Sequence, residues 1–94
     1  MKVSWTRPAL RQITEAREYI AIDNPDAATH QIERIEFTLH QLTAFPMMGR
    51  MGMRAGTREI PVPGTPYILV YRVKKETVQV LAVLHGARNW KEPR

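Results

Sequence analysis

The chain has 94 residues, no cysteine and a formal net charge of +5. This length is too short for two hydrophobic cores, so we expect residues 1–94 to form a single domain. A composition of 44% hydrophobic and 24% charged residues excludes an intrinsically disordered chain, and the lack of cysteine excludes disulfides, thiolate chemistry and Cys-ligated zinc. No apolar run approaches the roughly 20 residues that span a bilayer, and no signal-peptide core follows Met1. We therefore expect a cytoplasmic protein that does not enter a membrane.

The positive charge is concentrated in the C-terminal half of the chain. Residues 1–49 contain five Lys or Arg and six Asp or Glu, a net charge of −1, whereas residues 50–94 contain nine and three, a net charge of +6. Such a field favours anionic partners, either nucleic acid or an acidic protein surface. The alternative is that these charges only keep an apolar sheet in solution.

The N-terminal residues predict a short strand followed by an amphipathic helix. Residues 2–5 (K-V-S-W) are the strand candidate, Thr6 is placed to cap a helix, and Pro8 lies in the first turn, where a missing N–H is tolerated. Apolar residues then recur at three- and four-residue steps, which gives the helix one apolar face. The residues of this predicted face are Leu10, Ile13, Ala16 and Ile20.

A second helix is predicted to begin directly after a break at residues 23–25. The residue before a proline is disfavoured in the helical conformation, so Asn24 ends the first helix, and its side chain can cap the second, with Pro25 at the first position. Pro46 and Gly49 end the second helix. Two helices joined by so tight a break predict a helical hairpin. The predicted apolar seam of the second helix is Ala28, Ile32, Ile35, Leu39 and Leu42.

The second half of the chain predicts three strands, at residues 57–62, 67–73 and 77–84. Turn residues separate the first two strands, and the short segment between the last two requires an antiparallel hairpin. Pro61 and Pro63 cannot donate a ladder hydrogen bond, so the first of these strands is predicted to be an edge or bulged strand. Together the elements predict an α+β fold in which a helical hairpin packs on a small antiparallel β-sheet, in the order β-α-α-β-β-β.

The strand at residues 67–73 is apolar on both faces except at Arg72. One face must pack on the helical hairpin. The other face is either covered within the chain or available to a partner, because large exposed apolar patches usually mark interaction sites. The sequence therefore indicates a protein that binds a partner.

The predicted loop at residues 47–55 is rich in Met, Gly and Arg. Methionine is flexible and polarizable, so its side chains suit either an adaptable contact surface or a seal over the core. The four residues concerned are Met47, Met48, Met51 and Met53.

The sequence excludes most conventional active sites. There is no phosphate-binding GxxxxGK[ST] or GxGxxG segment and no HExxH segment, and His30, His40 and His85 are too far apart in the sequence for a local metal site. Ser4 is the only serine and lies in a predicted strand, which makes it a poor nucleophile candidate. We therefore expect no metal and no cofactor.

Cationic side chains at the rim of the predicted sheet are the remaining candidates for a site. Cleavage of RNA without a metal needs a group that accepts the 2′-hydroxyl proton, a group that protonates the leaving oxygen, and cations that stabilise the phosphorane. Arginine together with histidine or tyrosine can supply these functions. The candidates are Arg50, Arg54, Arg58, Arg72, His85 and Arg88, with Tyr71 and Trp90 near them in the sequence.

These candidates also have structural interpretations. Arg72 alternates with apolar neighbours, so it also suits an ion pair with Glu59 or Glu76 at the rim of the sheet. His85 ends the last predicted strand, where it can simply hydrogen-bond to the backbone. The sequence leaves both interpretations open.

Three segments of the C-terminal half resemble a known protein family. They are G-T-R-E-I at residues 56–60, Y-I-L-V-Y-R-V at residues 67–73, and V-Q-V-L-A-V-L-H-G-A-R at residues 78–88. The opening strand that ends in Trp5, the helix break, and the F-P-M-M-G-R segment that follows the second helix fit the same layout. This ordered set, which covers nearly the whole chain, resembles the RelE/ParE superfamily of toxins from bacterial type II toxin–antitoxin systems.

The resemblance is closer to the ParE branch than to the RelE branch. In ribosome-dependent RNases of the RelE type, the middle strand typically reads Y/H-R-L-V-Y, and its arginine is a catalytic cation. Ile68 stands at the matching position here, and the chain lacks the tyrosine that those RNases carry near the C-terminus. ParE-like members have no recognised nuclease site and inhibit DNA gyrase by binding to it.

The resemblance therefore implies a ParE-like toxin, associated with plasmid stabilization and growth arrest, that inhibits DNA gyrase and is neutralised by a cognate antitoxin. No residue is assigned a catalytic role, and whether the chain is an enzyme depends on the branch to which it belongs. The implied inhibitory surface consists of Arg58, Arg72, His85, Arg88 and Trp90. The implied antitoxin contacts are Leu10, Ile13, Ile68, Val70, Arg50 and Arg54.

Two alternative functions stay open. The first is a RelE-like endonuclease that cleaves mRNA on the ribosome, for which the catalytic candidates are Arg58, Arg72, His85 and Arg88. The second is a non-toxic interaction module with the same fold.

Overall fold

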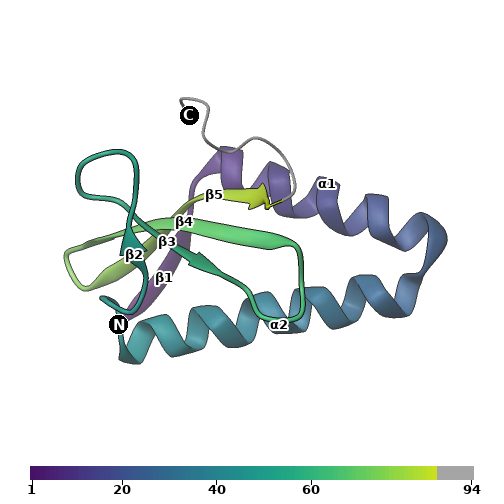
Figure 1. Ribbon diagram of the computed structural model, residues 1–94, viewed down its shortest axis with the longest axis horizontal. Coiled ribbons are helices and arrows are strands. Elements are labelled where there is room, and N and C mark those ends of the chain that lie inside the picture. The colour runs from purple at the N-terminus through teal and green to yellow at the C-terminus, as the bar shows by residue number, and fades with distance from the viewer. Residues whose placement is uncertain (87–94) are drawn as a thin grey trace.

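The computed structural model describes residues 1–86. In this part of the chain, two helices cover one face of a five-stranded β-sheet (Figure 1). The predicted α+β class and the predicted helical hairpin are confirmed. In chain order the elements are β1 (Lys2–Trp5), α1 (Arg7–Asp23), α2 (Pro25–Ala44), β2 (Arg50–Met51), β3 (Arg58–Pro61), β4 (Tyr67–Lys74) and β5 (Thr77–His85).

The strands lie in the order β1-β5-β4-β3-β2 across the sheet. β5, β4, β3 and β2 pair antiparallel with one another, but β1 pairs with β5 in parallel, with Trp5 opposite Val80. The sheet is therefore mixed, which corrects the prediction of an antiparallel sheet. A strand without a hairpin connection carries no local signal for its direction. Here α1, which follows β1 directly, packs against β5.

The sequence did not predict β2, which lies within the predicted loop at residues 47–55. Its two residues pair with β3, Arg50 opposite Glu59 and Met51 opposite Arg58. So short a strand has no alternating pattern to detect. β3 lies between β4 and β2, so the predicted edge or bulged position is wrong for this strand. The prolines are tolerated because the β2 pairing ends at Glu59 and leaves the Pro61 end of β3 without a second described neighbour.

Both predicted helix N-caps are confirmed. Thr6 Oγ1 accepts a hydrogen bond from the N–H of Ala9 at 3.3 Å, and Asn24 Oδ1 accepts one from the N–H of Ala27 at 3.0 Å. Asn24 also ends α1, since its own N–H donates to the carbonyl oxygen of Ile20. Asn24 thus ends α1 and caps the N-terminus of α2, and it forms the turn of the hairpin.

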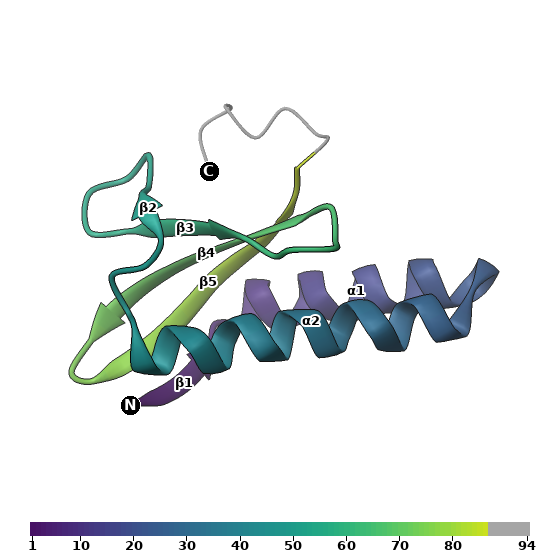
Figure 2. The ribbon, with the colours of Figure 1, turned by 60° about the horizontal axis from the view of Figure 1, so that its bottom comes forward.

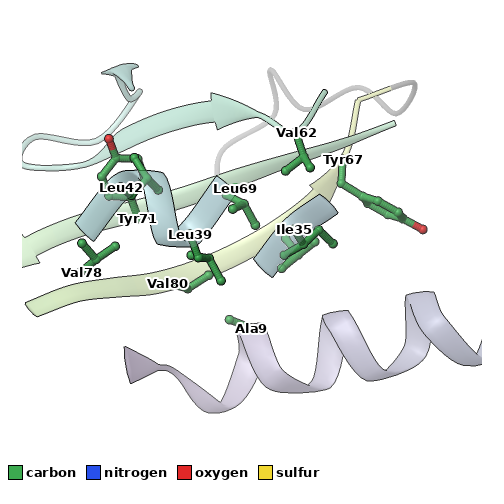
Figure 3. Close-up of a cluster of buried hydrophobic side chains, with 11 residues drawn as sticks. Ala9, Ile35, Leu39, Leu42, Val62, Tyr67, Leu69, Tyr71, Val78 and Val80 are labelled. Atoms are coloured by element: carbon green, nitrogen blue, oxygen red, sulfur yellow. The ribbon is translucent and has the colours of Figure 1, made fainter. Parts of the chain in front are cut away.

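The apolar face of α1 begins one residue earlier than predicted. Leu10 is 49% exposed, whereas Ala9 is fully buried and lies on the side of α1 that faces the sheet (Figure 3). Ile13, Ala16 and Ile20 pack against the core as predicted. The spacing of the observed face still alternates between three and four residues, so the sequence pattern allowed either start.

The core lies between the helices and the sheet (Figure 3). α2 contributes Ile35, Leu39 and Leu42 from its predicted seam, and β4 contributes Leu69 and Tyr71, which are fully buried. Burying an aliphatic side chain of this size stabilises the fold by about 1.5–3 kcal/mol. The buried cluster comprises Ala9, Ile35, Leu39, Leu42, Val62, Tyr67, Leu69, Tyr71, Val78, Val80 and Val83.

β5 continues past the end of β1, so its outer edge needs other hydrogen-bond partners. The Thr6 hydroxyl lies 3.2 Å from the carbonyl oxygens of both Val80 and Leu81, and the N–H of Val83 donates to Gln12 Oε1 at 2.7 Å. Buried backbone groups without a partner are destabilising. The start of α1 therefore satisfies the edge that β1 leaves uncovered.

The turn between β4 and β5 contains two residues in the left-handed backbone region. Lys75 and Glu76 have φ values of 49° and 58°. A residue with a side chain is disfavoured in this conformation by roughly 1–2 kcal/mol. Positive φ at both central positions is typical of a type I′ turn, in which Asn-Gly is the preferred pair.

We expect the double substitution Lys75→Asn with Glu76→Gly to raise the free energy of unfolding by about 1–2 kcal/mol, because it relieves this backbone strain. Urea denaturation of the variant and the wild type measures the difference. Ala55→Gly, at an exposed position without positive φ, is the control and should be neutral or slightly destabilising. An unchanged or lowered stability of the double variant would show that the turn stores no strain.

Candidate functional surface

The sheet has a helix-facing side and an opposite side, which we call the outer face. Side chains alternate between the two along each strand, and residues paired across strands share a face. The helix-facing residues of β4 are Tyr67, Leu69 and Tyr71, and its outer-face residues are Ile68, Val70 and Arg72.

The structure separates the described residues of the predicted inhibitory surface. Arg58 lies opposite Tyr71 in the register and therefore on the helix-facing side. His85 lies on the same side, at the other end of β4, where its ring is in edge contact with that of Tyr67 at a centroid distance of 5.6 Å. Arg72 lies on the outer face, so these three residues do not form one continuous surface.

This separation corrects the grouping that the sequence suggested. The position of a residue near the end of a strand does not determine which face of the sheet it occupies, because a shift of one residue moves its side chain to the opposite face. Arg88 and Trp90, the other two members of the predicted surface, lie outside the described residues. The role of each of the five residues stays a prediction.

Arg72 is held by a neutral partner. Its Nε donates to Oε1 of Gln79, its cross-strand neighbour in β5, at 2.6 Å. Within residues 1–86, the ion pair with Glu59 or Glu76 that the sequence allowed is not formed. The Arg72 side chain is exposed and is oriented by the amide of Gln79 rather than neutralised by a carboxylate.

Glu59 is a buried carboxylate on the outer face. It is 2% exposed and lies between Arg50 of β2 and Val70 of β4. Arg50 Nη2 lies 3.3 Å from Glu59 Oε1, which places a positive charge beside the carboxylate. A buried charge is strongly destabilising unless it is paired. Arg50, predicted as an antitoxin contact, therefore has a structural role in the sheet.

The predicted antitoxin contacts are distributed over three parts of the fold. Leu10 on α1 and Arg54 in the loop before β3 are exposed, whereas Ile13 packs against the core. The remaining three, Arg50, Ile68 and Val70, belong to the outer face of the sheet, where Val70 is 5% exposed. Their contact with an antitoxin stays a prediction.

Two side chains hold the segment that connects α2 to β2. The fully buried Tyr71 donates its hydroxyl to the carbonyl oxygen of Pro46 at 2.7 Å and accepts the N–H of Gly49 at 2.9 Å. Arg58 Nη1 donates to the carbonyl oxygens of Gly49 at 2.8 Å and Met47 at 3.4 Å. We call these four hydrogen bonds the Tyr71–Arg58 clamp.

Only glycine fits at position 49. A Cβ atom there would lie 2.6 Å from the Tyr71 hydroxyl oxygen and 2.8 Å from the carbonyl oxygen of Glu59. The backbone must pass this close to the tyrosine for the clamp to form. In the sequence, Pro46 and Gly49 mark the end of a helix and part of the family layout, but nothing local links them to the distant Tyr71.

The clamp leaves large apolar side chains of the same segment in solvent. Phe45, Met47, Met48 and Met51 are between 45% and 78% exposed. Met53 is 55% exposed as well, so a seal over the core, one of the two roles that the sequence allowed for the methionines, is wrong for all four. A shallow, open hollow is lined by Ala44, Phe45, Pro46, Met47 and Met48.

No group of three or more His, Asp or Glu side chains suited to holding a metal ion occurs within residues 1–86. In the same range, no helix is both long enough and apolar enough to cross a bilayer.

Tyr71→Phe is expected to lower the free energy of unfolding by about 1–3 kcal/mol, because it leaves the carbonyl of Pro46 and the N–H of Gly49 without their buried partner. Tyr19→Phe removes the same hydroxyl from a side chain that is 76% exposed, and should change stability by less than about 0.5 kcal/mol. Chemical denaturation of both variants measures the difference. Equal effects would show that the clamp does not stabilise the fold.

Burial raises the pKa of Tyr71 above the ordinary value of 10.0, and the N–H of Gly49 and the charge of Arg58 oppose this only in part. The unfolded chain therefore loses this proton first as the pH rises. The stabilisation is complete below pH 10.0 and is lost at higher pH. We expect the stability advantage of the wild type over Tyr71→Phe to stay unchanged up to about pH 10 and to shrink as the pH rises above it, measured by denaturation at each pH. A constant advantage would contradict this.

Comparison with known proteins gives a consistent assignment. The model of the family described as ParE toxin of type II toxin-antitoxin system, parDE, matches residues 3–90. The chain is 37% identical over 89 residues to protein Y4kP of Sinorhizobium fredii, covering 95% of this chain and 92% of that protein. It is 31% identical over 87 residues to toxin RelE2 of Caulobacter vibrioides, covering 93% and 97%.

The fold is also similar to that of a solved structure, the chromosomal ParDE toxin–antitoxin system from P. aeruginosa. The TM-score is 0.79 at 23% sequence identity, and the match covers 90% of this chain and 95% of that one. The family match spans both helices and all the described strands except Lys2, the first residue of β1. The chain belongs to the ParE toxin family of type II toxin–antitoxin systems, within the RelE/ParE superfamily.

Proposed function

We propose that the chain inhibits DNA gyrase by binding to it, and that a cognate antitoxin neutralises this activity. Membership of the ParE family supports a toxin with an antitoxin partner. The choice of gyrase rests on the resemblance of the strand segments to the ParE branch and on the absence of a converging set of catalytic groups among the described residues.

The separation of Arg72 from His85 is the observation that carries this proposal. An RNase needs a proton acceptor, a proton donor and a cation within reach of one phosphate. Arg72 lies on the outer face, whereas His85 lies on the helix-facing side against Tyr67. Ile68 occupies the position of the catalytic arginine in RelE-type RNases, and an aliphatic side chain cannot stabilise a phosphorane. Binding is therefore better supported than cleavage.

An RNase that acts on the ribosome is the second candidate function. The likeness to toxin RelE2, at 31% identity, favours it. In that case Arg58, Arg72, His85 and Arg88 are the catalytic candidates. Cleavage of mRNA in a purified translation reaction, and only there, distinguishes this function from gyrase inhibition.

We expect purified protein at micromolar concentration to block supercoiling by bacterial DNA gyrase and to cause cleaved DNA to accumulate. The readout is the supercoiling reaction on a relaxed plasmid, with and without protein. The matched control adds a cognate antitoxin, which should restore supercoiling. Full supercoiling at every toxin concentration would remove gyrase as the target, and absence of growth arrest on expression would favour a non-toxic module.

A further inference from the structure

The segment from Phe45 to Met53, which we call the methionine loop, exposes an unusual amount of apolar surface. Phe45 is 67% exposed, Met47 65%, Met48 45% and Met51 78%. Side chains of this size are ordinarily buried, and when several gather on the surface they usually mark a contact site. Methionine is also the side chain that adapts most readily to the shape of a partner.

The exposure is imposed by the fold. The Tyr71–Arg58 clamp binds the backbone at Pro46, Met47 and Gly49, and the N–H of Met48 donates to the carbonyl oxygen of Phe45 at 3.0 Å. The backbone groups thus face inward while the apolar side chains face solvent. A surface held in place before binding loses less entropy when a partner docks. The loop therefore presents large apolar side chains from a backbone that is held by hydrogen bonds at residues 45–49.

The surroundings of the loop are positively charged. Residues 45–58 contain three arginines and no Asp or Glu. The first acidic residue after them, Glu59, is buried beside Arg50 and contributes little negative field at the surface. Arg50 is paired with Glu59, Arg58 donates to loop carbonyls and keeps its charge, and Arg54 is exposed. The methionine loop thus combines an apolar centre with a cationic rim in which Arg54 is the exposed charge.

We infer that the methionine loop is the docking surface for the protein target of the toxin, and that it receives an acidic segment with large apolar side chains. The charge of the rim selects the acidic partner, and the apolar centre supplies the buried contact. Nucleic acid fits less well, because its binding depends on contacts to phosphates rather than on exposed methionine and phenylalanine. This inference rests on the proposed function, in which the target is DNA gyrase.

The methionine loop and the turn of the helical hairpin lie at opposite ends of α2, so a target bound to the loop does not contact the turn. α2 begins at the hairpin turn and ends at the loop, so its 20 residues separate the two by about 30 Å. Figure 2 shows the turn and the loop at opposite ends of α2. The hairpin end also carries exposed apolar side chains, Tyr19 and Ile22, which are 76% and 79% exposed. This end provides matched control positions.

The test compares the double variants Met47→Ser/Met48→Ser and Tyr19→Ser/Ile22→Ser. Both remove two exposed apolar side chains and neither disturbs the core. Binding of the full-length chain to purified bacterial DNA gyrase is measured by biolayer interferometry, and inhibition by the supercoiling reaction. We expect the methionine variant to bind at least about tenfold more weakly, and the hairpin variant to stay within about twofold of the wild type.

A second pair of variants tests the charge. Arg54→Glu in the loop and Arg17→Glu on α1 change the net charge equally at exposed positions. Arg54→Glu should weaken gyrase binding several-fold, more strongly at low ionic strength, and Arg17→Glu should not. Loss of binding in Arg54→Glu with wild-type binding in the methionine variant would indicate a nucleic-acid contact and overturn the inference.

The remaining outcomes are also decisive. Wild-type gyrase binding in the methionine variant would overturn the inference and leave the proposed function intact. If that variant instead lost antitoxin binding or self-association, the loop would be assigned to that other occupant, and the inference would also be overturned. If the wild type arrests growth without binding gyrase, the proposed function fails. The inference is then decided by growth: it stands if only the methionine variant loses growth arrest, and it fails if that variant arrests growth fully.

Discussion

The Tyr71 hydroxyl connects the end of the helical layer to the centre of the sheet, and much of the structure depends on it. The tyrosine ring completes the core beneath α2, while its oxygen binds the backbone on both sides of the turn that leaves that helix. A buried hydroxyl must find partners, and here those partners are the backbone groups that orient β2. The pairing of Arg50 with Glu59 follows from this placement, because β2 must lie beside β3 for it to form.

Some arginines of the C-terminal half stabilise the fold, and others are exposed on its surface. Arg58 binds loop carbonyls, Arg50 neutralises Glu59, and Arg72 is oriented by Gln79 on the outer face. A net charge counted from the sequence therefore overstates the field available to a partner. Residues 45–58 keep a positive excess, since this segment contains three arginines and no Asp or Glu.

Regular elements were predictable from the sequence because their signals are local. The caps at Thr6 and Asn24 and the seam of α2 depend on residues within one or two turns, and each is confirmed. The direction of β1, the existence of β2 and the face of Arg58 depend on contacts between distant segments, for which the sequence holds no local signal. The grouping of Arg58, Arg72 and His85 failed for the same reason, since each was placed by its distance along the chain rather than across the sheet.

The pairing of β1 with β5 has a consequence for the order in which the molecule assembles. Val3 finds its partner, Val78, at the far end of the described chain. The first strand therefore cannot form its ladder until β5 has been synthesised, and such distant pairing slows folding. A nascent chain on the ribosome lacks the finished sheet. The parallel β1–β5 ladder is therefore among the last contacts of the sheet that can form.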